Sequence, residues 1–329
     1  GKMLDAMGAL ALASTFVYQL NGHVLKVIGK NKWVSPLALT WILHVLVVVL
    51  APRAYQKWPS LLKQLDNMKV KKHRFFIDVV VNSFLQMLIN YFWMNSSQFI
   101  PTQLTAAIYQ AAIGVVYVIS VLFMGEKLVL PKACGVVIAV CGVCLSSFFP
   151  PLRVSSDISS KATQVEHDYA WGCTCALLAL FCKVASQIFC KVELAGASLE
   201  FMGQFNIHMG IAHIYAVLPV MLLLDRFGVP DMSFQMDTTW PMIPMVCLAG
   251  AMCTFVNYGY QTVPVVRSPL FLCRFQVLGI IFAVIFDSLL YGDAPQALGY
   301  LGYFCILFSF ALISGILGTS AKKDGEKMQ

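Results

Sequence analysis

The chain has 329 residues, of which 59% are hydrophobic and 12% charged, and its mean hydropathy is +0.74. These values exclude an ordinary soluble domain, in which about half of the residues are apolar and about a quarter are charged. The formal net charge of +7 does not by itself indicate nucleic-acid binding, because basic residues in the cytosolic loops of membrane proteins give the same excess. We therefore expect a protein of the lipid bilayer that binds no nucleic acid.

Hydrophobic segments follow one another along the whole chain. Each is long enough to cross ~30 Å of hydrocarbon as a helix that rises ~1.5 Å per residue. A helix also satisfies its own backbone polar groups, as a membrane-spanning segment must. The sequence therefore predicts an all-α integral membrane protein with ten transmembrane helices. The predicted helices are 4–28, 33–52, 75–95, 101–124, 132–150, 169–190, 199–224, 240–261, 264–290 and 295–318.

The second half of the chain repeats features of the first at an offset of 167 residues. Five helices are an odd number, so a second five-helix copy enters the membrane with the opposite orientation. We predict two inverted five-helix repeats, at 1–150 and 169–318, with a linker at 151–168 and a cytosolic tail at 319–329. The matching features are Asn90-Tyr91 with Asn257-Tyr258, Gly125-Glu126 with Gly292-Asp293, and Gly135 with Gly302.

Most Lys and Arg residues of the predicted loops fall on the side of the two termini. Basic residues are retained on the cytosolic side of membranes, so both termini are expected to be cytosolic. The sequence leaves open whether the membrane is an endomembrane, such as that of the Golgi, endoplasmic reticulum or vacuole, or the plasma membrane.

Two arginines lie in the predicted helix 264–290. Arg274 is near its middle, and Arg267 precedes it by seven residues, which places both on one helical face. Charges within a bilayer usually face a partner or a water-filled cavity, and two guanidinium groups suit a phosphate or carboxylate. We expect both to contact the substrate. In the alternative interpretation, Arg267 reaches the cytosolic interface and Arg274 pairs with Asp78.

Further polar residues lie within predicted helices. Asp78, Asn82, Gln86 and Asn90 recur at intervals of four and form one stripe, which is expected to face a cavity or another helix. Of these, we assign Asn82 and Gln86 to substrate binding, Asp78 to ion coupling, and Asn90, with its counterpart Asn257, to the scaffold.

Lys183, Tyr109 and Gln110 complete the predicted binding residues. Lys183 either lines the cavity or extends its side chain to the interface. Tyr109 and Gln110 pair an aromatic face with an amide, which suits a flat ring.

Two histidines of the helix 199–224, His208 and His213, are candidates for proton coupling. Their spacing of five does not place both on one face for a metal, and we expect neither a metal nor a cofactor. Glu126 and Asp293 follow turn glycines and are expected to stabilise the start of the next helix.

Short motifs resemble a known family. Segment 105–110 reads Thr-Ala-Ala-Ile-Tyr-Gln, the turn 125–127 reads Gly-Glu-Lys, and Gly135 opens the next helix. This pattern resembles the repeat end of the drug/metabolite transporter superfamily, most closely the solute carriers that include nucleotide-sugar transporters and the EamA-type permeases. The resemblance implies ten helices in inverted repeats, and alternating access, often as an antiporter. It departs at 111–114, Ala-Ala-Ile-Gly, where carriers of the sialic-acid type have a Lys.

Together these patterns favour a secondary transporter of a small organic anion, such as a nucleotide sugar or a phosphorylated or carboxylated metabolite. One alternative is a permease for neutral or cationic metabolites or drugs, and a second is an ion-conducting protein of the same fold. An intramembrane enzyme is disfavoured because no pair of carboxylates, Ser/His/Asp set or group of metal ligands lies at one depth in the predicted helices. The expected partners are the small-molecule substrate and the bilayer, and a homodimer stays open.

Overall fold

The computed structural model describes residues 2–30, 34–68, 70–123, 129–149, 162–228, 242–267, 269–276, 278–292 and 294–313. Helices account for nearly all of this part of the chain, and no strand occurs in it. The first half contains α1 (Lys2–Lys30), α2 (Pro36–Val45), η1 (Leu46–Leu50), α3 (Ala51–Gln56), α4 (Trp58–Asn67), α5 (Lys72–Phe99), α6 (Thr102–Gln110), α7 (Ala112–Phe123) and α8 (Leu130–Phe148). The second half contains α10 (Ala162–Glu193), α11 (Leu199–Ala212), η2 (His213–Val217), α12 (Leu218–Arg226), α13 (Met242–Val266), α14 (Pro269–Gln276), α15 (Leu278–Tyr291) and α16 (Ala297–Ile313).

Seven helical stretches of the described residues are long and apolar enough to cross a membrane. Two shorter apolar helices, α15 and α16, follow them. The chain is therefore an all-α, multi-pass membrane protein, which confirms the predicted class. The seven stretches are 36–56, 72–99, 102–119, 130–148, 168–193, 199–226 and 242–266.

Some predicted boundaries were wrong. The helix predicted to begin at 264 does not begin there, because α13 continues to Val266 with Pro264 inside it, and α14 begins at Pro269. Proline is tolerated at the start of a helix, but it also occurs within membrane helices, where neighbouring groups compensate for the missing N–H. A proline in the sequence therefore does not by itself identify a helix boundary. Likewise α10 begins at Ala162, inside the predicted linker 151–168.

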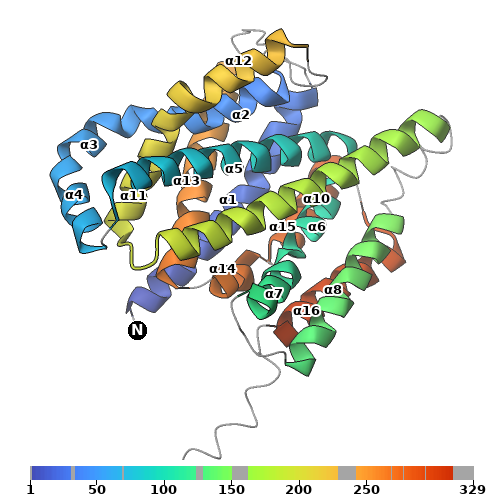
Figure 1. The fold of residues 1–329 in the computed structure, drawn as a ribbon. Helices are drawn as coiled ribbons and strands as arrows, with labels where there is room; N and C mark the ends of the chain where they lie inside the picture. The colour runs from blue at the N-terminus through green and yellow to red at the C-terminus, as the bar shows by residue number, and fades with distance from the viewer. Residues whose placement is uncertain are drawn as a thin grey trace, which may run out of the picture.

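Helices of one half pack against helices of the other (Figure 1). The first long helix of each half lies along the third of the other half: α1 along α13, and α10 along α5. Helices α8 and α16 lie side by side, as the green and red ribbons of Figure 1 show. These crossings bring α1, α5, α6, α10 and α13 together around the middle of the bundle.

Two irregular turns interrupt the second helix of each half at equivalent positions. The 3₁₀ turn η1 begins at Leu46 and the π turn η2 begins at His213, 167 residues later. Each is followed by a proline in the next helix, Pro52 in α3 and Pro219 in α12. A proline ring cannot donate to, and clashes with, the carbonyl four residues before it, so the preceding turn departs from α geometry. The predictions of helices 33–52 and 199–224 do not include this pair of turns.

Candidate solute-binding cavity

A small cavity of about 40 Å³ lies among α1, α5, α6, α10 and α13. The residues that line it come from both halves of the chain, and they combine aromatic rings with amides and one lysine among the described residues. Of the residues predicted to bind substrate, Gln86, Tyr109 and Lys183 all lie in this lining. The fold thus brings together three side chains that the sequence separates by up to about a hundred residues.

Aromatic side chains form one wall of the cavity. The ring of Tyr18 stacks on that of Tyr109, with centroids 5.6 Å apart and an interplanar angle of 9°. Trp93 and Tyr260 approach the same Tyr18 ring at 5.2 and 5.5 Å. Three of these four residues were not singled out from the sequence, because an aromatic residue in an apolar helix gives no sequence signal of whether it faces a cavity.

Lys183 is directed into the cavity and not toward the membrane interface. Its side chain is buried, with an exposed fraction of 3%. The ammonium donates to the backbone oxygen of Tyr109 at 3.3 Å and lies 3.7 Å from the centroid of the Tyr109 ring. The ring of Tyr260 lies 5.9 Å away. Aromatic faces attract cations, most strongly where water is excluded, so this arrangement holds a positive charge within an apolar bundle.

Several polar atoms of the cavity lining have no hydrogen-bond partner. A buried polar atom without a partner costs about 1–3 kcal/mol, and few occur in native structures without a reason such as a bound ligand or water. They come from α1, α5, α10 and α13, and so approach the cavity from different sides. These atoms are Asn21 Oδ1, Trp93 Nε1, Gln187 Oε1 and Gln261 Oε1.

The polar stripe of α5 joins this helix to its neighbours. Gln86 donates to Ser186 Oγ at 3.0 Å, and Ser186 in turn donates to Asn82 Oδ1 at 2.8 Å. Asn82 also contacts Met209 Sδ at 2.9 Å. Gln86 lines the cavity. Asn82, one turn away, is not among the lining residues and instead connects α5 to α10 and α11.

Asn90 and Asn257, the pair related by the 167-residue offset, meet at one histidine. Their side-chain amides lie 3.2 and 3.3 Å from His44 Nε2, and both also line the cavity. The ring of His213 stacks on His44 with centroids 4.4 Å apart and an interplanar angle of 5°. His213 thus lies behind the cavity wall. His44 was not singled out from the sequence, although an ionisable residue within a predicted membrane helix is a signal in its own right.

Other predicted residues lie away from the cavity. Asp78 pairs with Arg74 at 3.1 Å, and Arg74 also bonds Glu193 at 2.8 Å. His208 packs against the rings of Trp58 and Phe75.

Arg267 follows the end of α13 and is absent from the lining. Because α13 ends before Arg267 and α14 begins after it, the predicted shared helical face of Arg267 and Arg274 was wrong. Arg274 lies in α14, but its side chain, and that of Gln110, are outside the described part of the structure, as are residues Glu126 and Asp293. The roles of these four stay predictions.

A buried carboxylate that is not among the predicted site residues lies in α15. Asp287 is fully buried and accepts a hydrogen bond from the backbone N–H of Gln103, in the first turn of α6, at 2.7 Å. The positive end of that helix favours the carboxylate. Its other oxygen lies 3.8 Å from His23 Nδ1. An acidic residue inside an apolar segment is unusual enough that the sequence alone contained this signal.

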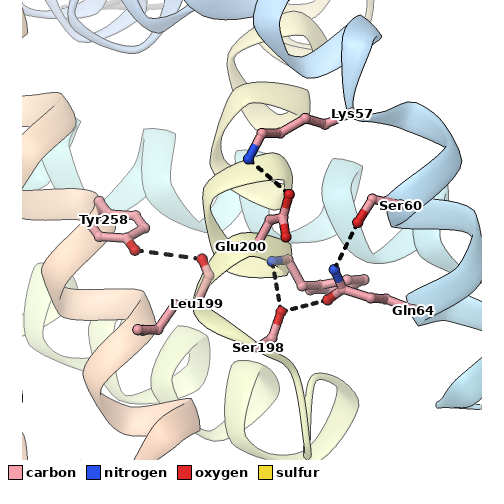
Figure 2. Close-up of polar contacts among 8 residues, drawn as sticks. Lys57, Ser60, Gln64, Ser198, Leu199, Glu200 and Tyr258 are labelled. Atoms are coloured by element: carbon pink, nitrogen blue, oxygen red, sulfur yellow. Dashed lines mark hydrogen bonds and ion pairs between the residues drawn. The ribbon is translucent and has the colours of Figure 1, made fainter. Parts of the chain in front are cut away.

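Polar contacts at one end of the bundle join α3 and α4 to the start of α11 (Figure 2). Lys57 pairs with Glu200 at 2.8 Å, Ser198 donates to Gln64, and Tyr258 of α13 donates to the Leu199 carbonyl at 3.5 Å. Lys57 and Glu200 are both about half exposed, and such pairs contribute only about 0–1 kcal/mol. These contacts therefore hold the segments together only weakly.

No family model and no curated protein matches the chain. A solved structure described as a crystal structure of a protein matches with a TM-score of 0.59, and the match covers 96% of this chain and 99% of that one at 11% sequence identity. At this identity the match shows a shared fold and carries no information on function.

Proposed function

We propose that the protein is a secondary transporter of a small organic solute, and that the solute binds in the cavity around Lys183. The observation that carries the proposal is a membrane-buried cavity that combines a lysine, an aromatic wall and unpaired amide oxygens. Polar groups at this depth are costly in lipid, and they usually mark the path of a solute.

The chemistry of the cavity favours a solute with an anionic group. Lys183 is the charged residue of the described lining, which contains no Asp or Glu. A carboxylate or phosphate could accept from the ammonium, while an apolar or flat part of the solute packs on Tyr18, Tyr109 or Tyr260. Amide groups such as those of Gln187 and Gln261 would then orient it.

The size of the cavity supports alternating access. At about 40 Å³ it is far smaller than a typical ligand pocket of about 300–1,000 Å³. A metabolite can enter only if helices separate, and the exposed Tyr258–Leu199 contact of Figure 2, which joins α13 to α11, is weak enough to break when they do.

The architecture favours inverted repeats with ten crossings. The first helix of each half packs on the third helix of the other half, and the irregular turns η1 and η2 fall at equivalent positions. A pseudo-two-fold axis between the halves explains both features. The drug/metabolite transporter superfamily, to which the sequence motifs point, has this arrangement.

A second candidate is a carrier of organic cations. The ammonium of Lys183 lies 3.7 Å from the Tyr109 centroid, so the same aromatic wall could hold a substrate ammonium if the lysine moved aside. The third interpretation, an ion-conducting protein of the same fold, predicts uncoupled ion flux instead of saturable exchange of a solute.

The test is a thermal-shift screen of the detergent-purified protein with nucleotides, nucleotide sugars, phosphorylated metabolites, carboxylates and organic cations. A ligand selective for the folded state, at about 100 times its Kd, stabilises by about 2.7 kcal/mol, which raises Tm by several degrees. We expect an anion to do this in the wild type and in Lys191→Gln, a control in the same helix, but not in Lys183→Gln. The same anion should show saturable counterflow in proteoliposomes.

Stabilisation by cations alone, unchanged in Lys183→Gln, would contradict the anion proposal and favour the second candidate. Arg274→Gln belongs in the same screen, since that residue is predicted to supply a second positive charge.

A further inference from the structure

Two buried histidines stack at the centre of the bundle, at the junction of α2, α5, η2 and α13. The exposed fractions of His44 and His213 are 4% and 0%. His44 lies two residues before η1, and His213 opens η2, so each ring is attached to one of the two equivalent irregular turns. The backbone oxygen of His213 also accepts from Trp41 Nε1 at 2.9 Å, which ties η2 to α2.

Hydrogen bonds define the protonation of both rings. Nδ1 of His44 lies 2.8 Å from the Thr40 carbonyl, and Nδ1 of His213 lies 2.8 Å from the Met209 carbonyl. A carbonyl only accepts, so each Nδ1 carries the proton and each Nε2 of a neutral ring offers a lone pair. His44 Nε2 receives the amides of Asn90 and Asn257, whereas His213 Nε2 is buried without a partner.

A further proton on either ring conflicts with at least one of these contacts. On His44 Nε2 it would face two amide N–H groups. The Asn90 amide could not rotate to accept this proton, because its Nδ2 also donates to the Gln86 carbonyl at 2.9 Å. Rotation would place Asn90 Oδ1 against the Gln86 carbonyl oxygen, and the two acceptors would repel. On His213 Nε2 the new N–H would be buried without an acceptor, and a charged ring would lie 4.4 Å from its neighbour.

The surroundings of the pair offer no compensating anion. From α5 the facing group is Asn90, and from α13 it is Asn257, whose amide also contacts the Cys253 thiol at 3.4 Å. The small space beside His44 is lined by Asn206, Met209, Gly210 and Thr254 together with apolar residues, none of them acidic among the described lining.

We propose that the His44–His213 pair is a proton-binding site. Both rings are neutral in the arrangement described here, and the pair binds a proton in a second arrangement, in which α2 and α11 separate from α5 and α13. A proton that binds one arrangement better shifts the equilibrium toward it. Asn90 and Asn257 contact His44 and also line the cavity, so proton and solute act on the same two side chains. The coupling part of this inference rests on the proposed transport function, whereas the proton site itself does not.

Amide hydrogen exchange of the purified full chain, without any added solute, tests the site. After correction for the intrinsic effect of pH, we expect residues 40–50 and 209–217 to exchange about fivefold or more faster near pH 5.5 than near pH 8, within the usual range of coupling between sites. Helices α8 and α16, which lie away from the pair, should show no such change.

The acceleration should vanish in His44→Gln, since the Gln oxygen still accepts from the two Asn amides but binds no proton. His213→Gln provides a second variant in case the first fails to fold. His208→Gln is the matched control, because His208 makes the same Nδ1 contact with a carbonyl, that of Gln204 at 2.8 Å, outside the pair.

An acceleration that is absent from the wild type, or that persists in both His44→Gln and His213→Gln, would overturn the inference. Neither result bears on whether an anion stabilises the protein, so failure of the proton site and failure of the proposed function are separable.

Discussion

Individual side chains show how an apolar bundle accommodates polar atoms. The ammonium of Lys183 lies against aromatic faces and donates to a backbone carbonyl. The carboxylate of Asp287 accepts from a backbone N–H in the first turn of α6. Gln86, by contrast, is bonded to Ser186 of the neighbouring helix. Each is surrounded by groups from other helices, so its environment depends on packing between segments distant in sequence.

Glycines set the distance between α8 and α16. A Cβ added to Gly142 would lie 2.6 Å from the Gly302 carbonyl oxygen, and one added to Gly302 would lie 2.7 Å from that of Gly142. Backbone atoms cannot move aside as a flexible side chain can. Small residues at such crossings let membrane helices approach closely.

At this scale we predict that Gly142→Ala destabilises the protein by about 1–3 kcal/mol, because the two helices must separate. The thermal midpoint of the purified protein measures it. Gly114→Ala is the control: its Cβ would meet Val136 Cγ1 at an ordinary 3.5 Å, so alanine there should be neutral or slightly stabilising. Equal losses in the two variants would contradict the role of close packing.

At the scale of elements, the paired turns η1 and η2 are the distinctive feature. Helix α12 begins with the Leu218 N–H bonded to the His213 carbonyl, five residues back, whereas α3 begins with the Ala51 N–H bonded to the Val48 carbonyl, three residues back. One turn is wider and the other tighter than an α-helix, but a proline follows both. Such irregular turns often occur at functional hinges.

We predict that Pro219→Ala slows amide exchange at residues 213–217 by about tenfold or more, because proline in a helix costs about 3 kcal/mol and alanine allows regular bonding to form. Hydrogen exchange with mass spectrometry measures it. Pro52→Ala should act in the same way on residues 46–50. Pro131→Ala, at the first turn of α8, where no N–H is needed, should leave both segments unchanged. Unaltered exchange in the first two variants would show that other contacts impose the turns.

At the scale of the whole molecule, the number of crossings determines where the ends lie. Ten crossings return the chain to its starting side, whereas seven would leave its ends on opposite sides. Seven helical stretches meet the criteria of length and apolarity, while α1 contains polar residues such as Gln19, Asn21 and His23, all of them buried. Their burial inside the bundle explains how a less apolar helix could still cross.

We predict that N-glycosylation acceptors fused at either end of the chain stay unmodified in a eukaryotic cell, because both ends are expected in the cytosol. An acceptor inserted within 229–239, between the predicted helices 199–224 and 240–261, should be modified, since that segment is predicted on the other side. A shift in gel mobility that is reversed by a glycosidase reports each result. Modification at one end only would indicate an odd number of crossings.

The sequence by itself determined the structural class. Composition and long apolar runs identify an all-α membrane protein, because lipid leaves the backbone no other economical choice. The 167-residue offset located Asn90 and Asn257, and the rarity of charge in apolar helices located Lys183. Boundaries at Pro264 and Ala162 were missed because local signals there fit either a helix or a connection.

Only the tertiary structure decided which polar residues meet. It placed Gln86, Tyr109 and Lys183 in one cavity with Tyr18, Trp93 and Tyr260, brought Asn90 and Asn257 onto His44, and paired Asp78 with Arg74. The physical reason is that helical phase gives the face of a residue but not the helix opposite it. Contacts between helices depend on how the whole bundle packs, and no single segment contains that information.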